Sequence, residues 1–439
     1  MIPLLAALLS AATPSNIGQE ELYGATNIVA AVGNGELSAA WSAQGELVVL
    51  RWPNPTFDEH LHYKTETGES AWSLPYMGAA ENDGGFDGVI IGAEPEIQWL
   101  RDPPFLTSVG YADTDIGVVE RQHSWGLYGV VCHEFVSVDR PVLRRRCTLT
   151  GDEVHSYVGY LNPALMTEHT AFAPSEQSAG DDGRAGQLRW EHGASAFVDV
   201  AGTTTLVVGV DPRPEQVHCG RDNDTGPGDA FLAVGGSQAT SGPENLSYRV
   251  AAKQVETLIV LAGSEEEALL HLEAARAVPF ADAMAARELA DRQWLTGLDL
   301  PDIPEAGWAE FVDRALLSLQ SAQDPESGAM AVSVASQPAL NVDRARDGAV
   351  FDALLSWVAD DEALSAHTAF LASMQRTTDG QDAAFAPDLA VAGSWADGYL
   401  SDGTPHGFAD FGIDQVGWGV WTLAEHAAAD QWDAIEAGV

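Results

Sequence analysis

At 439 residues the chain is long enough for two domains, and 46% hydrophobic against 20% charged residues is the composition of a folded protein. Aspartate and glutamate number 65 against 21 lysines and arginines, a formal net charge of −44 at pH 7. Because proteins bind phosphate groups and anionic lipids through clustered Lys and Arg, this charge excludes nucleic acid and membranes as expected partners.

The same charge suits an uncharged substrate or a salty solvent. At 1 M salt the Debye length is about 3 Å, so repulsion among the acidic side chains is largely screened. A salt-adapted (halophilic) protein and an acidic protein of ordinary surroundings both fit the composition, and the sequence leaves that choice open.

The first residues resemble a short export signal. Residues 1–12 are apolar and end in small residues, but they lack the basic start of a typical signal peptide. Residues 1–19 are therefore a candidate signal-like segment, and a secreted or periplasmic location and a cytoplasmic one both stay open.

Residues 20–263 contain short β-rich runs separated by Gly, Pro, Asn and Asp. The clearest runs are 27–32, 46–51, 88–91, 128–138, 142–150, 204–210, 247–252 and 256–262. Many short strands with frequent turn signals are typical of an antiparallel sandwich, so we expect a β-sandwich domain here.

Cysteines and histidines in this stretch give weak signals for a bridge or a metal. Cys132, Cys147 and Cys219 lack the paired spacing of a zinc site, and buried free thiols are expected in preference to a Cys132–Cys147 disulfide. His60 and His62 would share one face of a strand and could hold a metal, but a surface strand without metal is the preferred interpretation. No metal or cofactor is therefore predicted, and a structural calcium ion is left open.

The pattern becomes helical after Gly263. Residues 264–298 are rich in Ala and Leu, with an N-cap at Ser264 and a break at Pro279. Further helices are expected at 305–323, 347–358, 361–376, 413–429 and 430–439. We interpret 264–303 as a helical linker and 304–439 as a helical domain with long loops.

Charged residues at two helix starts suggest a binding site. Arg346 offers a rigid fork of donors and Asp347 is an acceptor, so the pair could bind neighbouring hydroxyls of a sugar. Asp414 and Gln415 begin a later helix. Stabilisation of the helix N-termini is the alternative role for these side chains.

Aromatic residues in the same region are candidate platforms for the apolar face of a sugar ring. Trp395 lies in a loop rich in Gly and Asp, where a place in the binding site is favoured. Trp418 and Trp421 are three residues apart on an expected helix, where core packing is favoured.

Five short motifs, taken together, resemble a known family. In chain order they are Gly33-Asn34-Gly35, Trp52-Pro53-Asn54-Pro55, Arg344-Ala345-Arg346-Asp347, Asp402-Gly403-Thr404-Pro405 and Ile413-Asp414-Gln415. Their order and spacing resemble the bacterial and archaeal glucoamylases of glycoside hydrolase family 15. The resemblance implies an antiparallel super-β-sandwich, a helical linker and an (α/α)6 barrel.

The resemblance also implies an activity and a site. Family members remove glucose from the non-reducing ends of α-glucans with inversion, and relatives act on dextran or trehalose. The family's innermost sugar subsite corresponds to Arg346 and Asp347, and its substrate-lining loop to Asp414 and Gln415. Arg344 stands where the family has a Trp, which leaves the substrate preference open.

The catalytic pair is missing from the matched motifs. Inverting hydrolysis needs a carboxylic acid and a carboxylate, both glutamates in this family. Neither Glu425 nor Glu436 matches the acid position, and about five helices are expected where the barrel needs twelve. We therefore expect an incomplete barrel, no catalytic residue within these 439 residues, and an inactive chain when it is alone.

Two other functions are also compatible with the sequence. Disaccharide and α-glucan phosphorylases also join such a sandwich to an α/α barrel, but they need an anion site, and the helical half is poor in lysine. A non-catalytic carbohydrate-binding remnant would use the Arg346–Asp347 site without the acids.

Overall fold

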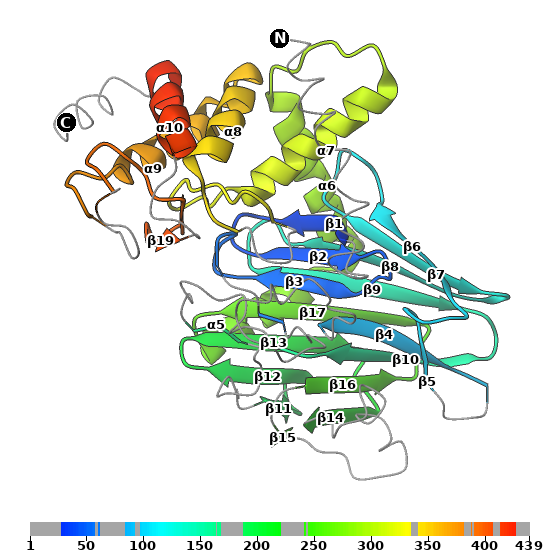
Figure 1. The fold of residues 1–439 in the computed structure, drawn as a ribbon. Helices are drawn as coiled ribbons and strands as arrows, with labels where there is room; N and C mark the ends of the chain where they lie inside the picture. The colour runs from blue at the N-terminus through cyan, green and yellow to red at the C-terminus, as the bar shows by residue number, and fades with distance from the viewer. Residues whose placement is uncertain are drawn as a thin grey trace.

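The computed structural model describes residues 28–57, 60–61, 84–92, 97–163, 165–167, 188–220, 241–242, 245–334, 341–381, 388, 390–406 and 413–426. Figure 1 shows two stacked β-sheets with a group of helices at one end. The signal-like segment 1–19, His62, Glu436 and the helix expected at 430–439 lie outside the described residues.

The first sheet has eight strands and runs in the order β1-β2-β3-β4-β10-β16-β14, with β5 paired to β4. Its strands are β1 (Ile28–Gly33), β2 (Ser38–Ser42), β3 (Leu47–Arg51), β4 (Gly85–Ile91), β5 (Ile97–Trp99), β10 (Val154–Leu161), β14 (Gln216–Gly220) and β16 (Asn245–Val250). All of the strand pairs in this sheet are antiparallel.

The second sheet has nine strands in the order β15-β11-β12-β13-β17-β9-β8-β7-β6. They are β6 (Leu106–Tyr111), β7 (Val119–Trp125), β8 (Tyr128–Val136), β9 (Val142–Thr150), β11 (Leu188–Glu191), β12 (Ala196–Ala201), β13 (Thr204–Asp211), β15 (Ser241–Gly242) and β17 (Gln254–Ala262). Trp41 and Leu47 of the first sheet share one buried core with Leu143 and Ile259 of the second. The expected β-sandwich is confirmed.

Each of the eight predicted strand runs corresponds to an observed strand. Strands such as β7 were missed because their sequences are polar. In β7 the buried positions alternate with exposed ones and include Arg121 and His123, so composition alone does not mark it as a core strand. Burial lowers the pKa of His123 to about 3, so Arg121 is the inward-facing charge of this strand, and its partners explain its burial.

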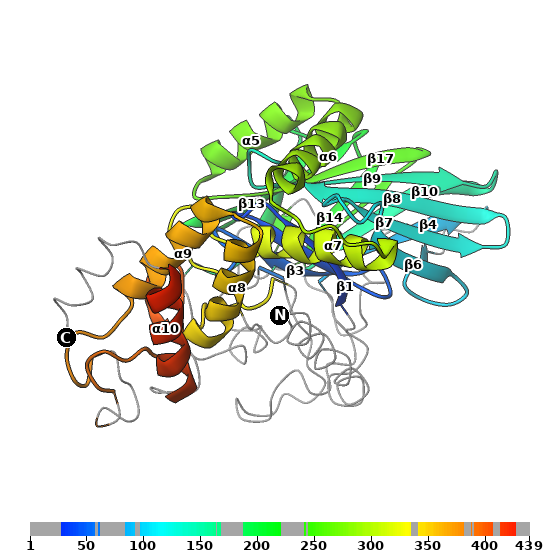
Figure 2. The ribbon, with the colours of Figure 1, turned by 90° about the horizontal axis from the view of Figure 1, so that it is seen from above.

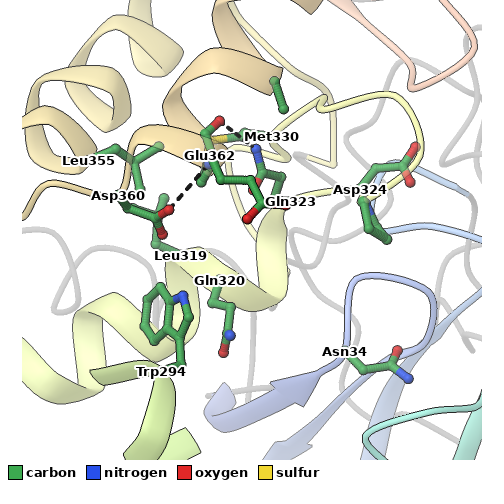
Figure 3. A pocket seen from close by; sticks show the side chains of 13 residues that line it. Asn34, Trp294, Leu319, Gln320, Gln323, Asp324, Met330, Leu355, Asp360 and Glu362 are labelled. Carbon is green, nitrogen blue, oxygen red and sulfur yellow. Dashed lines mark hydrogen bonds between the residues drawn. The ribbon is translucent and has the colours of Figure 1, made fainter. Parts of the chain in front are cut away.

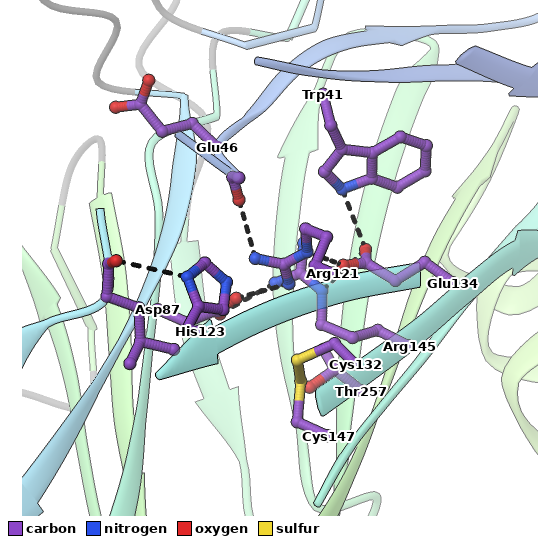
Figure 4. Close-up of polar contacts among 12 residues, drawn as sticks. Trp41, Glu46, Asp87, Arg121, His123, Cys132, Glu134, Arg145, Cys147 and Thr257 are labelled. Carbon is purple, nitrogen blue, oxygen red and sulfur yellow. Dashed lines mark hydrogen bonds and ion pairs between the residues drawn. A yellow bond between two sulfur atoms is a disulfide. The ribbon is translucent and has the colours of Figure 1, made fainter. Parts of the chain in front are cut away.

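Four buried charged side chains, Asp87, Arg121, Glu134 and Arg145, form a closed network inside the sandwich (Figure 4). Arg121 contacts Asp87 at 2.6 Å and also bonds Glu134, while Arg145 contacts both carboxylates at 2.9 Å. Burial opposes the charge on Asp87, but the two arginines outweigh it and lower the pKa of Asp87 to about 2. Two positive and two negative charges thus satisfy one another in the core.

A disulfide joins Cys132 and Cys147 beside this network, which corrects the expectation of free thiols. The hairpin of β8 and β9 places the two residues directly opposite each other. The register of a hairpin is set by its turn, and counting outward from the turn at Asp139 and Arg140 brings these cysteines together. Cys219 is free and buried.

His60 is also placed differently from the sequence-based expectation. It is fully buried rather than on a surface strand. One ring nitrogen lies 2.7 Å from the carbonyl oxygen of Trp52, and the other accepts a hydrogen bond from the backbone N–H of Met166. Both nitrogens are therefore used in fixing the loop that follows β3.

Two helices follow the sandwich, as the sequence predicts. They are α5 (Glu265–Ala277) and α6 (Phe280–Gly297), separated at Pro279. Ser264 caps α5 by accepting from the N–H of Glu267. The helix α5 lies on the outer face of the nine-stranded sheet (Figure 2), where Leu272 packs with Val260 and its neighbours.

The helical half contains α7 (Ala306–Ala322), α8 (Ala345–Trp357), α9 (Asp361–Ser373), α10 (Ile413–His426) and a small sheet of β18 (Gly398–Tyr399) and β19 (Pro405–His406). The first helix, α7, packs against β1, while α8, α9 and α10 pack against one another. These four helices fit a helical domain after the sandwich, and the (α/α)6 barrel stays a prediction. Within the described part of the chain, no helix combines the length and apolarity needed to cross a membrane.

The Gly33-Asn34-Gly35 turn joins the two halves. Asn34 holds the turn closed by accepting from the N–H of Leu37 at 2.8 Å, and its amide donates to the carbonyl of Ser137 at 3.0 Å. Gly35 has φ +84°, and a Cβ there would lie 2.7 Å from the carbonyl oxygen of Gln323. Only glycine lets the sandwich approach the end of α7 so closely.

Candidate functional site

The N-terminal ends of α8 and α10 lie side by side and bring four predicted residues together. Arg346 contacts Asp347 and Asp414, each at 3.1 Å. Gln415 is buried, and its side-chain oxygen accepts from the backbone N–H of Arg346 at 2.8 Å. A helix has no internal partner for its first N–H groups, so Gln415 of α10 caps α8 and fixes the two ends together.

The charged part of this cluster faces solvent. The side chains of Arg346 and Asp414 are 42% and 51% exposed, and that of Asp347 is 27% exposed. The hydrogen bond to Asp347 is the main cause that raises the pKa of Arg346, and Asp414 adds to it. An exposed guanidinium held between two carboxylates offers donors and acceptors at fixed positions.

Arg344 lies beside this cluster, at the N-cap of α8. Its guanidinium contacts Asp397 at 3.2 Å, and both side chains are mostly buried. The position where the resemblance implies a stacking Trp is thus occupied by an arginine in an ion pair. Since each arginine here already contacts a carboxylate, the cluster does not present a free cation to an anion.

Trp395 does not line the site, which corrects the sequence-based expectation. It is fully buried, and its indole N–H donates to the carbonyl of Leu371 at 2.8 Å. It packs in a core with Phe370 and Leu423 of α9 and α10. The surrounding Gly and Asp residues suggested a surface loop, but the loop folds back beneath the helices.

Trp418 and Trp421 are the exposed aromatics instead, at 41% and 39%. Their rings lie at 90° to each other with centroids 5.5 Å apart. Core packing was expected for both, and the structure contradicts that expectation. Residues four and seven positions after Asp414 share its face of α10, so the two rings extend the surface that Asp414 begins.

The segment Asp402-Gly403-Thr404-Pro405 forms a tight turn. Asp402 accepts from the N–H of Thr404 at 2.8 Å, and Gly403 has φ +83°. The motif therefore has a structural role, because the hydrogen bond from Thr404 to the carboxylate of Asp402 stabilises the turn.

A cavity of about 310 Å³ lies elsewhere, at the junction of the sandwich and the helices (Figure 3). Residues that line it are Asn34, Trp294, Leu319, Gln320, Gln323, Asp324, Pro325, Met330, Leu355, Asp360, Glu362, Ala363 and Ala366. Its polar groups serve the fold: Asp360 caps α9 by accepting from the N–H of Ala363, and Gln323 donates to the carbonyl of Ala363 at 2.9 Å. We therefore place the candidate site at the helix ends.

The structure describes one of the two late glutamates. Glu425 is exposed in the last turn of α10, about 16 Å along the helix axis from Asp414. At that distance it cannot share a sugar unit with the cluster.

One group among the described residues has the spacing of metal ligands, namely Asp87, Cys132 and Cys147. The disulfide occupies both sulfurs, so this group does not offer a site for the calcium ion that the sequence left open.

Neither family models nor curated proteins match this sequence. Solved structures do match. A bacterial glucoamylase complexed with acarbose superposes with a TM-score of 0.68 at 8% identity, covering 95% of this chain and 57% of that one. A putative kojibiose phosphorylase from the human microbiome superposes with a TM-score of 0.57 at 10% identity, covering 92% and 54%.

These comparisons show that the chain has a glucoamylase- and phosphorylase-like fold over nearly all of its length. At such low identities the likeness concerns the fold and does not decide between the two families. The chain spans a little more than half the length of each of these structures.

Proposed function

We propose that the chain is part of a glucoamylase-like glycoside hydrolase that acts on the non-reducing ends of α-glucans or related α-glucosides with inversion. The observation that carries the proposal is the contact of Arg346 with both Asp347 and Asp414 at the adjoining ends of two helices. Its support from the comparisons is the fold shared with a glucoamylase. The substrate is therefore an uncharged oligosaccharide.

Sugar recognition explains this arrangement better than helix stabilisation. A carboxylate in the first turn of each helix would stabilise that helix by itself. An arginine bridging the two carboxylates leaves acceptors and donors directed at solvent, which suits adjacent sugar hydroxyls. The exposed Trp418 on the same face adds a platform for the apolar side of a pyranose ring. In this proposal the cluster binds substrate and does not supply the acid or base.

Calorimetric titration with maltotetraose tests the proposal. Asp347→Asn should lower affinity about tenfold or more, because a hydrogen bond to a charged group contributes roughly 1.5–3 kcal/mol. Asp361→Asn is the matched control, since Asp361 also lies exposed in the first turn of a helix, α9, but outside the cluster. Equal affinity of the wild type and Asp347→Asn would remove Asp347 from the site.

A phosphorylase is the second candidate, favoured by the likeness to the kojibiose phosphorylase. Incubation of the protein with α-glucobioses with and without inorganic phosphate separates the two. Sugar 1-phosphate formed only with phosphate would establish a phosphorylase, and free glucose formed equally in both would establish a hydrolase. Binding without turnover would favour a binding role for these residues.

A further inference from the structure

A second group of polar residues lies beneath the candidate site and is completely buried. One ring nitrogen of His367 in α9 lies 2.6 Å from a carboxylate oxygen of Asp352 in α8, and the other lies 3.0 Å from Asp343, which precedes α8. Thr422 of α10 donates to the second oxygen of Asp352 at 2.5 Å. We call these four residues, Asp343, Asp352, His367 and Thr422, the His367 bridge.

The bridge sits directly against the turn of α8 that carries the site. A Cβ added to Gly348, the residue after Asp347, would lie 2.5 Å from Cε1 of His367. The imidazole therefore occupies the space that a side chain would need. Asp343 also accepts from the backbone N–H of Met330 at 2.8 Å, so the loop after α7 is tied to the same group.

The geometry and the electrostatics both favour the charged form of His367. A neutral imidazole donates from one nitrogen only, whereas this ring has a carboxylate acceptor at each nitrogen. Burial of the ring opposes the charge, but Asp352 and Asp343 outweigh it and raise the pKa of His367 to about 10. The imidazolium thus carries a positive charge between two carboxylates at neutral pH.

We propose that His367 is a positioning residue, which holds the ends of α8 and α10 in register so that Arg346 of one helix meets Asp414 of the other. Asp352 is five residues beyond Asp347 on α8, and Thr422 is eight residues beyond Asp414 on α10. α8 is therefore tied to His367 directly through Asp352, and α10 is tied to it indirectly, through the bond of Thr422 to Asp352. The effect on oligosaccharide affinity rests on the proposed function, while the effect on helix register does not.

Two variants and one control test this role. His367→Gln removes the charge at similar size, and Thr422→Val removes only the hydrogen bond to α10. The control is His271→Gln, because His271 is a partly exposed histidine of α5. Amide hydrogen exchange is followed in α5 and in the second turns of α8 and α10, where the N–H groups have acceptors within the helix. The conditions are chosen so that every variant stays folded by circular dichroism.

We expect His367→Gln to speed exchange in both second turns at least about tenfold and to weaken maltotetraose binding by a similar factor. Exchange in α5 and in the His271→Gln control should not change. Thr422→Val should speed exchange in α10, and it tests the bond from Asp352 to α10 even if the glutamine variant does not fold. The ¹⁵N spectrum of wild-type His367 at pH 8 should show two protonated ring nitrogens.

A neutral ring at pH 8, or unchanged exchange in the second turns of α8 and α10 in a folded variant, overturns the positioning role. If the wild type does not bind maltotetraose, the proposed function fails instead. In that case the ¹⁵N spectrum and the amide exchange rates still test whether His367 positions the two helices.

Discussion

The indole of Trp395 packs against the backbone of α10 at Gly419, where an added Cβ would lie 3.0 Å from the ring. The contact fixes the distance between α10 and the loop that follows α9. A side chain at position 419 would push the two apart, so the glycine and the tryptophan depend on each other.

Truncation of Trp395 should mainly lower stability, whereas truncation of Trp418 should mainly weaken binding. Trp395→Ala should lower the free energy of unfolding by about 3–5 kcal/mol, as expected for a fully buried Trp. Trp418→Ala should change stability by less than about 1 kcal/mol while weakening maltotetraose binding. Urea titration and calorimetry measure the two effects. A large stability loss on truncating Trp418 would instead assign that ring to packing.

Because of the buried network in the sandwich, removing one of its charges should lower the free energy of unfolding far more than removing a charge at the surface. Glu134→Ala leaves Arg121 and Arg145 with one carboxylate between them and should cost about 3–5 kcal/mol. Glu153→Ala, at an exposed glutamate, should cost less than about 1 kcal/mol. Both are measured by urea denaturation at pH 7, and comparable losses in the two variants would contradict the network's role.

We expect the stability of the folded protein to depend on pH through the buried carboxyl group of Asp199. Burial raises the pKa of Asp199 to about 7, and one of its oxygens has no hydrogen-bond partner among the described residues. Between pH 4 and 7 the folded state then binds more protons here than the unfolded state, so this contribution to stability is lost as the pH rises through 7.

Asp199→Asn removes that titration. We expect the variant to be more stable than wild type at pH 8, on the order of a few kcal/mol, and nearly equal to it at pH 4.5. Thermal unfolding at the two pH values gives the comparison. The same difference at both pH values would mean that the substitution acts through packing instead of protonation.

The net charge of −44 predicts that salt stabilises the protein. Screening by NaCl weakens repulsion among exposed carboxylates, so the melting temperature should rise between 0.05 and about 1 M salt. Sucrose at matched osmolality is the control for excluded-volume effects. A melting temperature that does not change with NaCl argues against salt adaptation and favours an ordinary acidic protein.

Periodicity and turn residues allowed the sequence to predict the main elements. The eight strand runs and the helices from α5 to α10 follow from local patterns, and the charged residues at the starts of α8 and α10 follow from their place at helix ends. Arg346, Asp347, Asp414 and Gln415 meet because those two ends adjoin.

Side-chain direction was harder to predict. Trp395 has the neighbours of a surface loop, and nothing in its local pattern shows that the loop turns beneath α9. Trp418 and Trp421 have the spacing of a core stripe, but the pattern does not tell which face of α10 is covered. His367 was missed altogether, because its partners lie fifteen and twenty-four residues away along the chain.

The loop after β3 reaches from the sandwich to the segment that leads into the candidate site. The side-chain amide of Asn341 donates to the carbonyl oxygens of Thr56 at 2.9 Å and Phe57 at 2.7 Å, and the hydroxyl of Thr56 accepts from the N–H of Ser401 at 2.8 Å. The backbone around the helix ends is thus held partly by atoms of the other half.

Replacing the sandwich with that of another protein would break these bonds unless the loop after β3 were kept together with the helical half. A substitution in the loop after β3 should therefore also alter the backbone around Asn341, some 285 residues later in the chain.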